Sequence, residues 1–298
     1  MPGPAPAHPS RRQVLAAAPA AALLAGFPAL AAPGLRVVSL DYGLASTLMA
    51  LGLPPVGISE RSGWDEWVVE PALPPDVREL GISSEPNLEV LAQLAPDLIL
   101  VTPFLDAQIA RLERYAPVLR LETFIWNGRP ILDACISATL SLAERIDRRT
   151  GAEQLLAAME ALFAGCRARL ARHADRPVVL AHFWDARHVR ISGDPSLFND
   201  VLTRIGLRNA WDQPTGAWGF QTVPVEELSG VADPDAMLLI FDPLPAGALE
   251  KLSQSPLWRA LPLTAPGRVR RMEPVLLFGM VNEAMRFARS VTAAMEAG

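Results

Sequence analysis

Tryptophan is the residue type whose number and placement point most directly to ligand recognition. The chain has seven tryptophans and two tyrosines among 298 residues. An indole ring combines a large, rigid apolar surface with one N–H donor, which suits a pocket for an amphipathic small molecule. Trp64 and Trp67 lie in an irregular, proline-rich stretch, and Trp218 lies in a loop between Gly216 and Gly219. We expect these three side chains to face a ligand.

A second group of polar side chains follows one predicted strand. In the segment 188–192, the two-residue period of a strand places Arg190 and Ser192 on one face and Val189 and Ile191 on the other. An arginine meets anionic oxygens through several N–H donors, a stronger contact than a neutral hydrogen bond. The sequence leaves open whether Arg190 binds such a group or is solvated on a polar strand face.

Neither a catalytic nor a metal-binding pattern accompanies these residues. The sequence has no Cys-x-x-Cys, no His-Glu-x-x-His and no Gly-x-Ser-x-Gly motif. Isolated strand histidines such as His182 and His188 are typical hydrogen-bonded structural residues rather than haem or metal ligands. We therefore expect no intrinsic cofactor, no resident metal and no enzymatic activity, and an exported α/β hydrolase is the remote alternative.

Composition and charge exclude several classes of protein. Half of the residues are hydrophobic, and 27 Lys and Arg face 32 Asp and Glu, giving a net charge of −5. This balance is typical of a globular protein and does not favour a nucleic-acid partner, whose phosphates require clustered cations. The length is about twice that of a typical domain of ~150 residues, so we expect two lobes.

The first 31 residues have the features of an export signal. Arg11 and Arg12 precede an alanine-rich apolar stretch that ends near a small-residue cleavage site at Ala31. The stretch is shorter than the ~20 residues that span a bilayer, so we predict a cleaved twin-arginine signal peptide and a periplasmic protein. An oxidising periplasm permits a disulfide, but the sequence leaves open whether Cys135 and Cys166 pair.

The order of elements predicts two α/β sandwich lobes joined by a long helix. A short helix, a Pro-Asp stop and an apolar strand occur at 85–101, and the same pattern recurs at 224–241. Further strands are predicted at 36–40 and 56–58, and a strand pair at 177–184 and 188–192. The predicted domains are an N-terminal lobe at 35–150, an interlobe helix at 151–173 and a C-terminal lobe at 174–298.

Several short segments of the sequence resemble segments found in one family of transport proteins. They are Trp67-Val68-Val69-Glu70-Pro71, Ser84-Glu85-Pro86-Asn87-Leu88-Glu89, Ser196-Leu197-Phe198, Asn209-Ala210-Trp211 with Trp218-Gly219, and Pro256-Leu257-Trp258. With them the mature chain resembles the periplasmic ferric hydroxamate siderophore-binding proteins of the FhuD type. The resemblance implies a class III, helical-backbone binding protein with a shallow interlobe cleft, small closure on binding and monomeric action.

The resemblance also suggests individual ligand contacts. Trp67, Trp211 and Trp218 match family aromatics, whereas the family arginine and tyrosine that grip the hydroxamate oxygens correspond to Ser83 and Leu105. A C-terminal aromatic pair corresponds to Leu276 and Phe278, and Arg190 stands where the family has an apolar cleft residue. Tyr42 is a further candidate because it follows the first strand, at the edge where open α/β sheets bind ligands.

The function that the resemblance implies is capture of a ferric siderophore, of hydroxamate-like type, and its delivery to an ABC permease of the inner membrane. Another cargo on the same fold, such as ferric catecholate, ferric citrate, cobalamin or haem, is the alternative. Binding proteins of this kind dock through one exposed carboxylate per lobe, and our candidates are Asp106 on the first lobe and Glu226 or Glu227 on the second.

Overall fold

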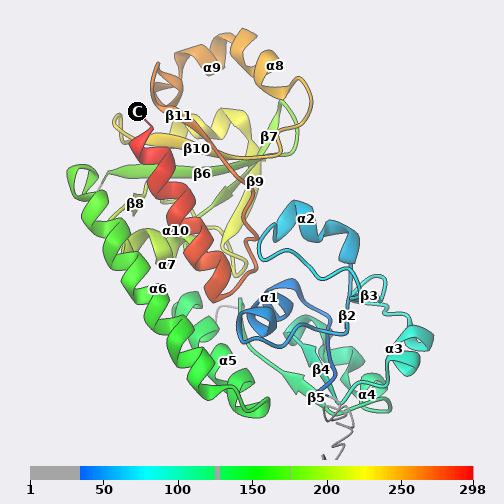
Figure 1. Ribbon diagram of the computed structural model, residues 1–298. Helices are drawn as coiled ribbons and strands as arrows, with labels where there is room; N and C mark the ends of the chain where they lie inside the picture. The colour runs from blue at the N-terminus through cyan, green and yellow to red at the C-terminus, as the bar shows by residue number, and fades with distance from the viewer. Residues whose placement is uncertain (1–33, 125–127, 175, 298) are drawn as a thin grey trace, which may run out of the picture. The chain divides into compact units, whose positions relative to one another are not determined.

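Two β-sheets with flanking helices organise the computed structural model, which describes residues 34–124, 128–174 and 176–297 (Figure 1). Leu35–Gly298 group into one compact unit. The predicted signal peptide at 1–31 and Trp126 lie outside the described residues. The predicted fold class, two α/β lobes with a long connecting helix, is confirmed.

The first lobe is built on a five-stranded sheet in the order β3-β2-β1-β4-β5, in which all neighbouring strands are parallel. Its strands are β1 (Val37–Ser39), β2 (Gly57–Ile58), β3 (Arg78–Glu79), β4 (Leu98–Val101) and β5 (Val118–Arg120). Its helices are α1 (Tyr42–Ala50), α2 (Trp64–Trp67), α3 (Leu88–Leu94) and α4 (Ile109–Leu112), with 3-10 turns η1 (Arg61–Gly63) and η2 (Pro103–Gln108). Every residue of β4 is buried, as its continuous apolar run predicts.

Local sequence signals explain where the first-lobe helices begin and end. The side chain of Asp41 caps α1 by accepting a hydrogen bond from the amide of Leu44 at 2.9 Å. Asn87 caps α3 in the same way, accepting from the amides of Glu89 and Val90. Helix α3 ends where Ala95 adopts a left-handed conformation directly before Pro96.

The second lobe is built on a six-stranded sheet, with β11-β10-β6-β7-β9 in order and β8 paired to β6. Its strands are β6 (Pro177–Phe183), β7 (His188–Ser192), β8 (Arg208–Asn209), β9 (Phe220–Pro224), β10 (Met237–Phe241) and β11 (Val269–Met272). Its helices are α7 (Leu197–Arg204), α8 (Ala248–Gln254) and α9 (Pro256–Ala260), with 3-10 turns η4 (Val225–Gly230) and η5 (Pro262–Thr264). Strands β6 and β7 pair antiparallel, which confirms the predicted strand pair.

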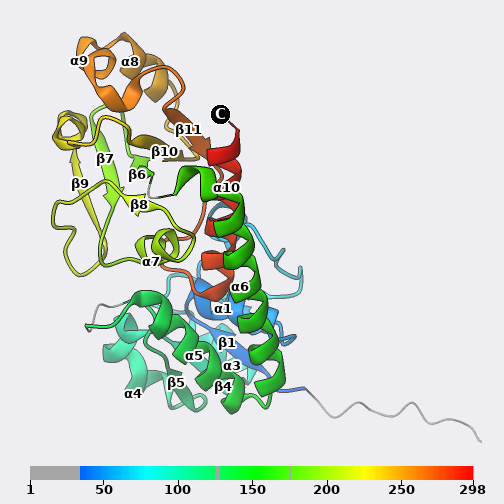
Figure 2. The ribbon, with the colours of Figure 1, turned by 90° about the vertical axis from the view of Figure 1, so that its left-hand side faces the viewer.

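Helices α5 (Ile131–Arg145), α6 (Arg149–Arg169) and α10 (Val281–Glu296) connect the lobes. The helix predicted at 151–173 begins two residues earlier and ends at Arg169, and a 3-10 turn, η3 (Ala171–His173), follows it. Helix α6 runs past both lobes, and α10 lies beside it from α1 to the second-lobe sheet (Figures 1 and 2).

One hydrophobic cluster, which we term the shared core, extends through these connecting helices into both lobes. It contains Leu44 and Leu48 of α1, Phe163 of α6, Phe198 of α7 and Phe287 of α10. The rings of Phe198 and Phe287 stack with centroids 4.2 Å apart. The two lobes therefore bury part of their apolar surface in the same cluster.

Cys135 and Cys166, whose pairing the sequence leaves open, are both free and buried. They lie on α5 and α6, and burial raises the pKa of the Cys135 thiol well above its usual range. In the described part of the chain, no helix combines the length and apolar character needed to cross a membrane.

Candidate ligand-binding pocket

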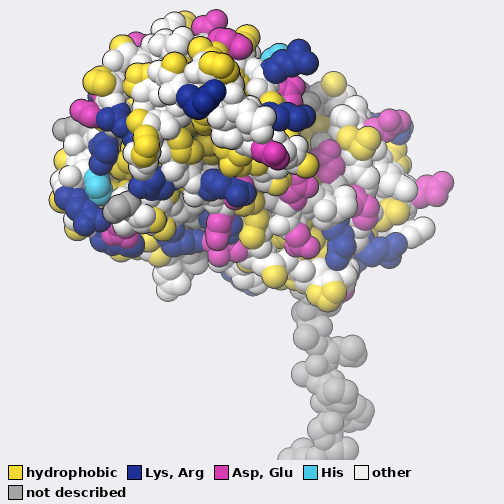
Figure 3. Space-filling model, turned by 90° about the horizontal axis from the view of Figure 1, so that it is seen from above, with side chains coloured by type: hydrophobic (Ala, Val, Ile, Leu, Met, Phe, Trp, Pro, Cys, Tyr) yellow, Lys and Arg dark blue, Asp and Glu magenta, His cyan; other side chains and the backbone are white. Residues whose placement is uncertain are grey.

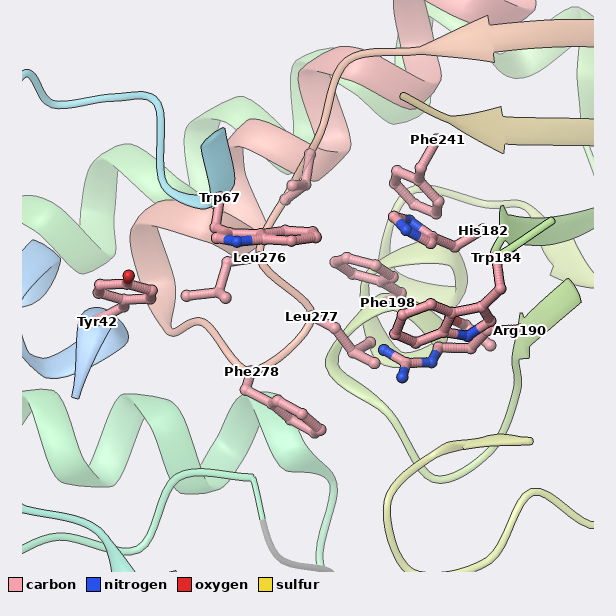
Figure 4. A pocket seen from close by; sticks show the side chains of 12 residues that line it. Tyr42, Trp67, His182, Trp184, Arg190, Phe198, Phe241, Leu276, Leu277 and Phe278 are labelled. Atoms are coloured by element: carbon pink, nitrogen blue, oxygen red, sulfur yellow. The ribbon is translucent and has the colours of Figure 1, made fainter. Parts of the chain in front are cut away.

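A pocket of about 300 Å³ lies where the two lobes meet (Figure 4). Its walls come from α1 and α2 of the first lobe, from β6, β7, β10 and α7 of the second, and from the segment that joins β11 to α10. It is lined by Tyr42, Trp67, His182, Trp184, Arg190, Ser192, Phe198, Phe241, Val275, Leu276, Leu277 and Phe278. Most of this surface is aromatic or aliphatic, as expected of a site for a bulky organic ligand.

The first-lobe wall is formed by Tyr42 and Trp67, both of which the sequence predicts as ligand contacts. The hydroxyl of Tyr42 donates a hydrogen bond to the carbonyl of Glu60, and its ring packs edge-on against Trp64 at 5.8 Å. Burial, followed by the nearby Glu60 carboxylate, raises the pKa of Tyr42 to about 12. Tyr42 is therefore a neutral, fixed wall residue at physiological pH.

The second-lobe wall is formed by the antiparallel strands β6 and β7. Their register pairs His182 with Arg190, so both side chains lie on the pocket face. Val189 and Ile191 are fully buried on the opposite face, which confirms the predicted alternation along β7. Ser192 is also buried and reaches the pocket from the same face as Arg190.

Arg190 is held by aromatic rings. Its guanidinium carbon lies 4.7 Å from the ring centroid of Trp184 and 4.2 Å from that of Phe220. Figure 4 shows the guanidinium pointing from the second-lobe wall toward Leu277. Burial lowers the pKa of Arg190, but a guanidinium still remains protonated at neutral pH. The stacking therefore presents a positive charge to the pocket in a fixed orientation.

His182 packs between two tryptophans of the pocket. Its ring centroid lies 6.0 Å from that of Trp67 and 6.2 Å from that of Trp184. Burial, and then the charge of Arg190, lower the pKa of His182 below its ordinary value of 6.5. The imidazole is therefore neutral at pH 7 and offers one donor and one acceptor.

Beside the pocket, four aromatic side chains connect the lobes, and we term them the aromatic bridge: Phe104, Phe124, Trp218 and Phe278. Phe104 of η2 and Trp218 of the loop before β9 stack face to face at 4.7 Å with an interplanar angle of 3°. Phe278 lies 5.0 Å from Phe124 and also lines the pocket. Sequence reasoning found Trp218 and Phe278 but missed Phe104 and Phe124.

The structure places five of the predicted ligand contacts outside the pocket lining. Trp218 lies beside the pocket, in the aromatic bridge. Trp64 is only 1% exposed and packs in the first-lobe core, and Leu105 is buried in the same lobe. Trp211 is buried in the second-lobe core. Ser83 lies in the turn before α3 and does not line the pocket. Phe104, the residue before Leu105, is exposed instead and stacks on Trp218.

The predicted docking carboxylates are exposed, but their surroundings differ. Asp106 forms a two-pronged ion pair with Arg120, with N–O distances of 2.6 and 3.0 Å, and this pairing lowers the pKa of Asp106. Glu226 and Glu227 lie on η4 and face solvent. Viewed from above, acidic and basic side chains are interspersed over the surface (Figure 3).

The described residues contain no group of three or more His, Cys, Asp or Glu side chains that could hold a metal ion. The pocket can hold a ligand between aromatic rings. Arg190, His182 and Ser192 offer hydrogen-bonding groups to such a ligand.

The position of Trp218 depends on the glycine that follows it. Gly219 has φ of +69°, and a Cβ there would lie 1.9 Å from the carbonyl oxygen of Pro195. We expect Gly219→Ala to lower the free energy of unfolding by more than ~1 kcal/mol and to disturb the Phe104–Trp218 stack, measured by urea denaturation and near-UV circular dichroism. Gly216→Ala is the matched control, because Gly216 has φ of +67° but open space around its Cβ. Equal effects of the two substitutions would contradict the clash with Pro195.

Known proteins are similar to this chain in both sequence and fold. A model of the periplasmic binding protein family matches residues 37–276. The chain is 32% identical to the iron(3+)-hydroxamate-binding protein FhuD of Escherichia coli K12 over 254 residues, covering 85% of this chain and 84% of that protein. It is 26% identical to the Fe(3+)-citrate-binding protein YfmC of Bacillus subtilis 168 over 235 residues, covering 78% and 71%. The crystal structure of FhuD from Vibrio cholerae with bound Fe3+-Desferal matches with a TM-score of 0.81 and 33% identity, covering 88% of this chain and 98% of that one. The chain thus belongs to the periplasmic binding protein family.

Proposed function

We propose that this protein is the extracytoplasmic solute-binding subunit of an ABC importer, that it captures a ferric hydroxamate siderophore in the pocket between its lobes, and that it delivers this cargo to the permease. The observation that carries the proposal is the aromatic pocket with Arg190 on its wall, in a chain about one-third identical to two ferric hydroxamate-binding proteins. Relatives of this type are transport proteins, which supports a binding role rather than an enzymatic one.

The chemistry of the pocket suits such a cargo. A siderophore already coordinates its iron, so the protein contributes no metal ligands and binds the organic shell instead. Trp67 and Phe278 offer apolar surface to that shell, and Tyr42 closes the first-lobe side. Arg190 and the neutral His182 offer N–H donors to oxygens of the chelate. Trp218 is assigned to the rim, through its stack with Phe104.

Export and docking complete the proposed role. The twin-arginine segment at 1–31 would direct the chain to the periplasm. Glu226 and Glu227 of η4 are the docking carboxylates of the second lobe, and Asp106 is that of the first. Because Asp106 is paired with Arg120, it would exchange this partner for an arginine of the permease.

The test is titration of the purified protein with ferric hydroxamates, ferric catecholates, ferric citrate, haem and cobalamin, following tryptophan fluorescence and, for affinity, calorimetry. We expect a ferric hydroxamate to bind and to quench, and Trp67→Ala to raise its Kd at least about tenfold, because an aromatic contact surface is lost.

Trp258→Phe is the matched control, since Trp258 is buried in the second-lobe core and does not line the pocket. It should leave the Kd unchanged. Binding of another cargo alone would retain the binding-protein role and refute the hydroxamate assignment, and no binding across the panel would refute the proposed function.

A further inference from the structure

We propose that Arg190 makes this pocket selective for anionic ferric chelates, so that its cargo is a hydroxamate siderophore that also carries carboxylate groups, as in the citrate-hydroxamate class. This inference rests on the proposed function and specifies the cargo of the same site. It depends on the charge balance of the pocket, on the absence of a counter-ion for Arg190 in the described residues, and on the orientation of its guanidinium.

The pocket presents one positive charge and no negative one. Of the twelve side chains that line it, Arg190 alone carries a formal charge at pH 7, because His182 is neutral and the remaining lining residues are aromatic, aliphatic or hydroxyl-bearing. Glu66, on the first lobe beside Trp67, is exposed to solvent and does not line the pocket. A neutral chelate would leave the charge of Arg190 unbalanced inside the complex.

Several arginines elsewhere in the described chain form ion pairs with carboxylates. Arg286, which is 7% exposed, contacts Glu273 at 3.0 Å, and Arg120 forms its two-pronged pair with Asp106. Arg190 has no such pair: among the residues that the structure describes, none forms an ion pair with it, and its buried Nε, like those of Arg61 and Arg270, has no hydrogen-bond partner. Since an unpaired buried donor is costly, a ligand oxygen that accepts from it is favoured.

The stacking of Arg190 fixes the direction in which this donor set points. The guanidinium carbon lies over the rings of both Trp184 and Phe220, and these two contacts restrict how the group can turn. Figure 4 shows the guanidinium end of Arg190 directed into the pocket. The planar donor fork of an arginine matches the two oxygens of a carboxylate better than it matches the single oxygens of a neutral group.

The experiment compares three ferric siderophores of different charge by calorimetry: ferric aerobactin, an anionic citrate-hydroxamate; ferrichrome, a neutral trihydroxamate; and ferrioxamine B, which carries an ammonium group. We expect the wild-type protein to bind the anionic chelate at least about tenfold more tightly than ferrioxamine B, with a preference that shrinks as salt is added. Arg190→Gln should raise the Kd for the anionic chelate about 30-fold or more and that for ferrichrome less than about threefold.

Two further variants separate charge from structure. Arg190→Lys keeps the charge and should retain the order of preference with weaker binding, because the fork is lost. Arg187→Gln removes the same charge from an exposed position in the turn between β6 and β7 and should change no Kd by more than about twofold. Equal weakening of all three chelates by Arg190→Gln, or wild-type preference for ferrichrome or ferrioxamine B, would overturn the inference while leaving the proposed function intact. Failure of all three chelates to bind the wild-type protein would instead refute the proposed function.

Discussion

Replacing Trp64 with alanine is expected to lower the free energy of unfolding by about 3–5 kcal/mol, the range typical of large-to-small substitutions in a core. Trp64 is 1% exposed and fills a first-lobe cluster with Ile58, Val68 and Val77. Its indole N–H also donates to the carbonyl of Pro71 at 2.9 Å. Alanine would leave a cavity and an unpaired carbonyl.

Equilibrium denaturation in urea, followed by far-UV circular dichroism, measures this loss. Trp64→Phe should recover most of the stability, because it keeps an aromatic ring and loses mainly the hydrogen bond. The contrasting control is Trp184→Phe, since Trp184 is 53% exposed on the pocket wall and should change stability by less than about 1 kcal/mol. A stable Trp64→Ala variant with weakened cargo binding would show that Trp64 is a ligand contact after all.

A second large effect concerns Asp41 and pH. Burial, opposed in part by the capping bond from Leu44 and reinforced by the buried Glu283, raises the pKa of Asp41 from 3.8 to about 7. A carboxyl group whose pKa is higher in the folded state binds a proton more tightly there, so its contribution to stability is complete below pH 4 and is lost as the pH rises through 7. Because Asp41 as a whole is only partly buried, we expect the loss to be about 2–4 kcal/mol.

Asp41→Asn should reveal this dependence, because asparagine can cap α1 in the same way but does not ionise. We expect its stability relative to wild type to rise by about 2–4 kcal/mol between pH 4 and pH 8, measured by urea denaturation across that range. Asp106→Asn is the control with the opposite sign: Arg120 lowers the pKa of Asp106, so any stability that this carboxylate adds is present above pH 4 and lost on acidification. A pH-independent difference between wild type and Asp41→Asn would show that Asp41 acts only as a cap.

Much of the sheet framework could be predicted because it depends on local sequence. The runs 98–101 and 237–241 are continuous apolar segments, and both form fully buried strands. Such runs are typical of strands in a parallel sheet that is covered on both faces. The cap of α3 is also local, because Asn87 accepts from the amides of Glu89 and Val90, two and three residues later. The pocket face of β7 could also be predicted from the sequence. In a strand without a bulge, successive side chains always point to opposite faces of the sheet.

The remaining site residues depend on contacts that no local pattern encodes. After β4 the chain enters the 3-10 turn η2, where a shift of one position turns a side chain by about 120° and so decides whether Phe104 or Leu105 faces the other lobe. Trp64 lies in a proline-rich segment without periodicity, and its burial depends on residues such as Ala45 and Val77, which are distant in the sequence. An alignment to a family motif shows which residue type stands at each position. It does not show whether that side chain points into the pocket or into the core.

The shared core couples the unfolding of the two lobes. Leu44 and Leu48 belong to the same hydrophobic cluster as Phe163 and Phe287, which come more than a hundred residues later in the chain. A fragment that ended after α5 would leave this apolar surface in water, so neither lobe is expected to fold as an autonomous module. The described chain should instead melt in one cooperative transition, and damage to either lobe would be felt as a loss of stability in both.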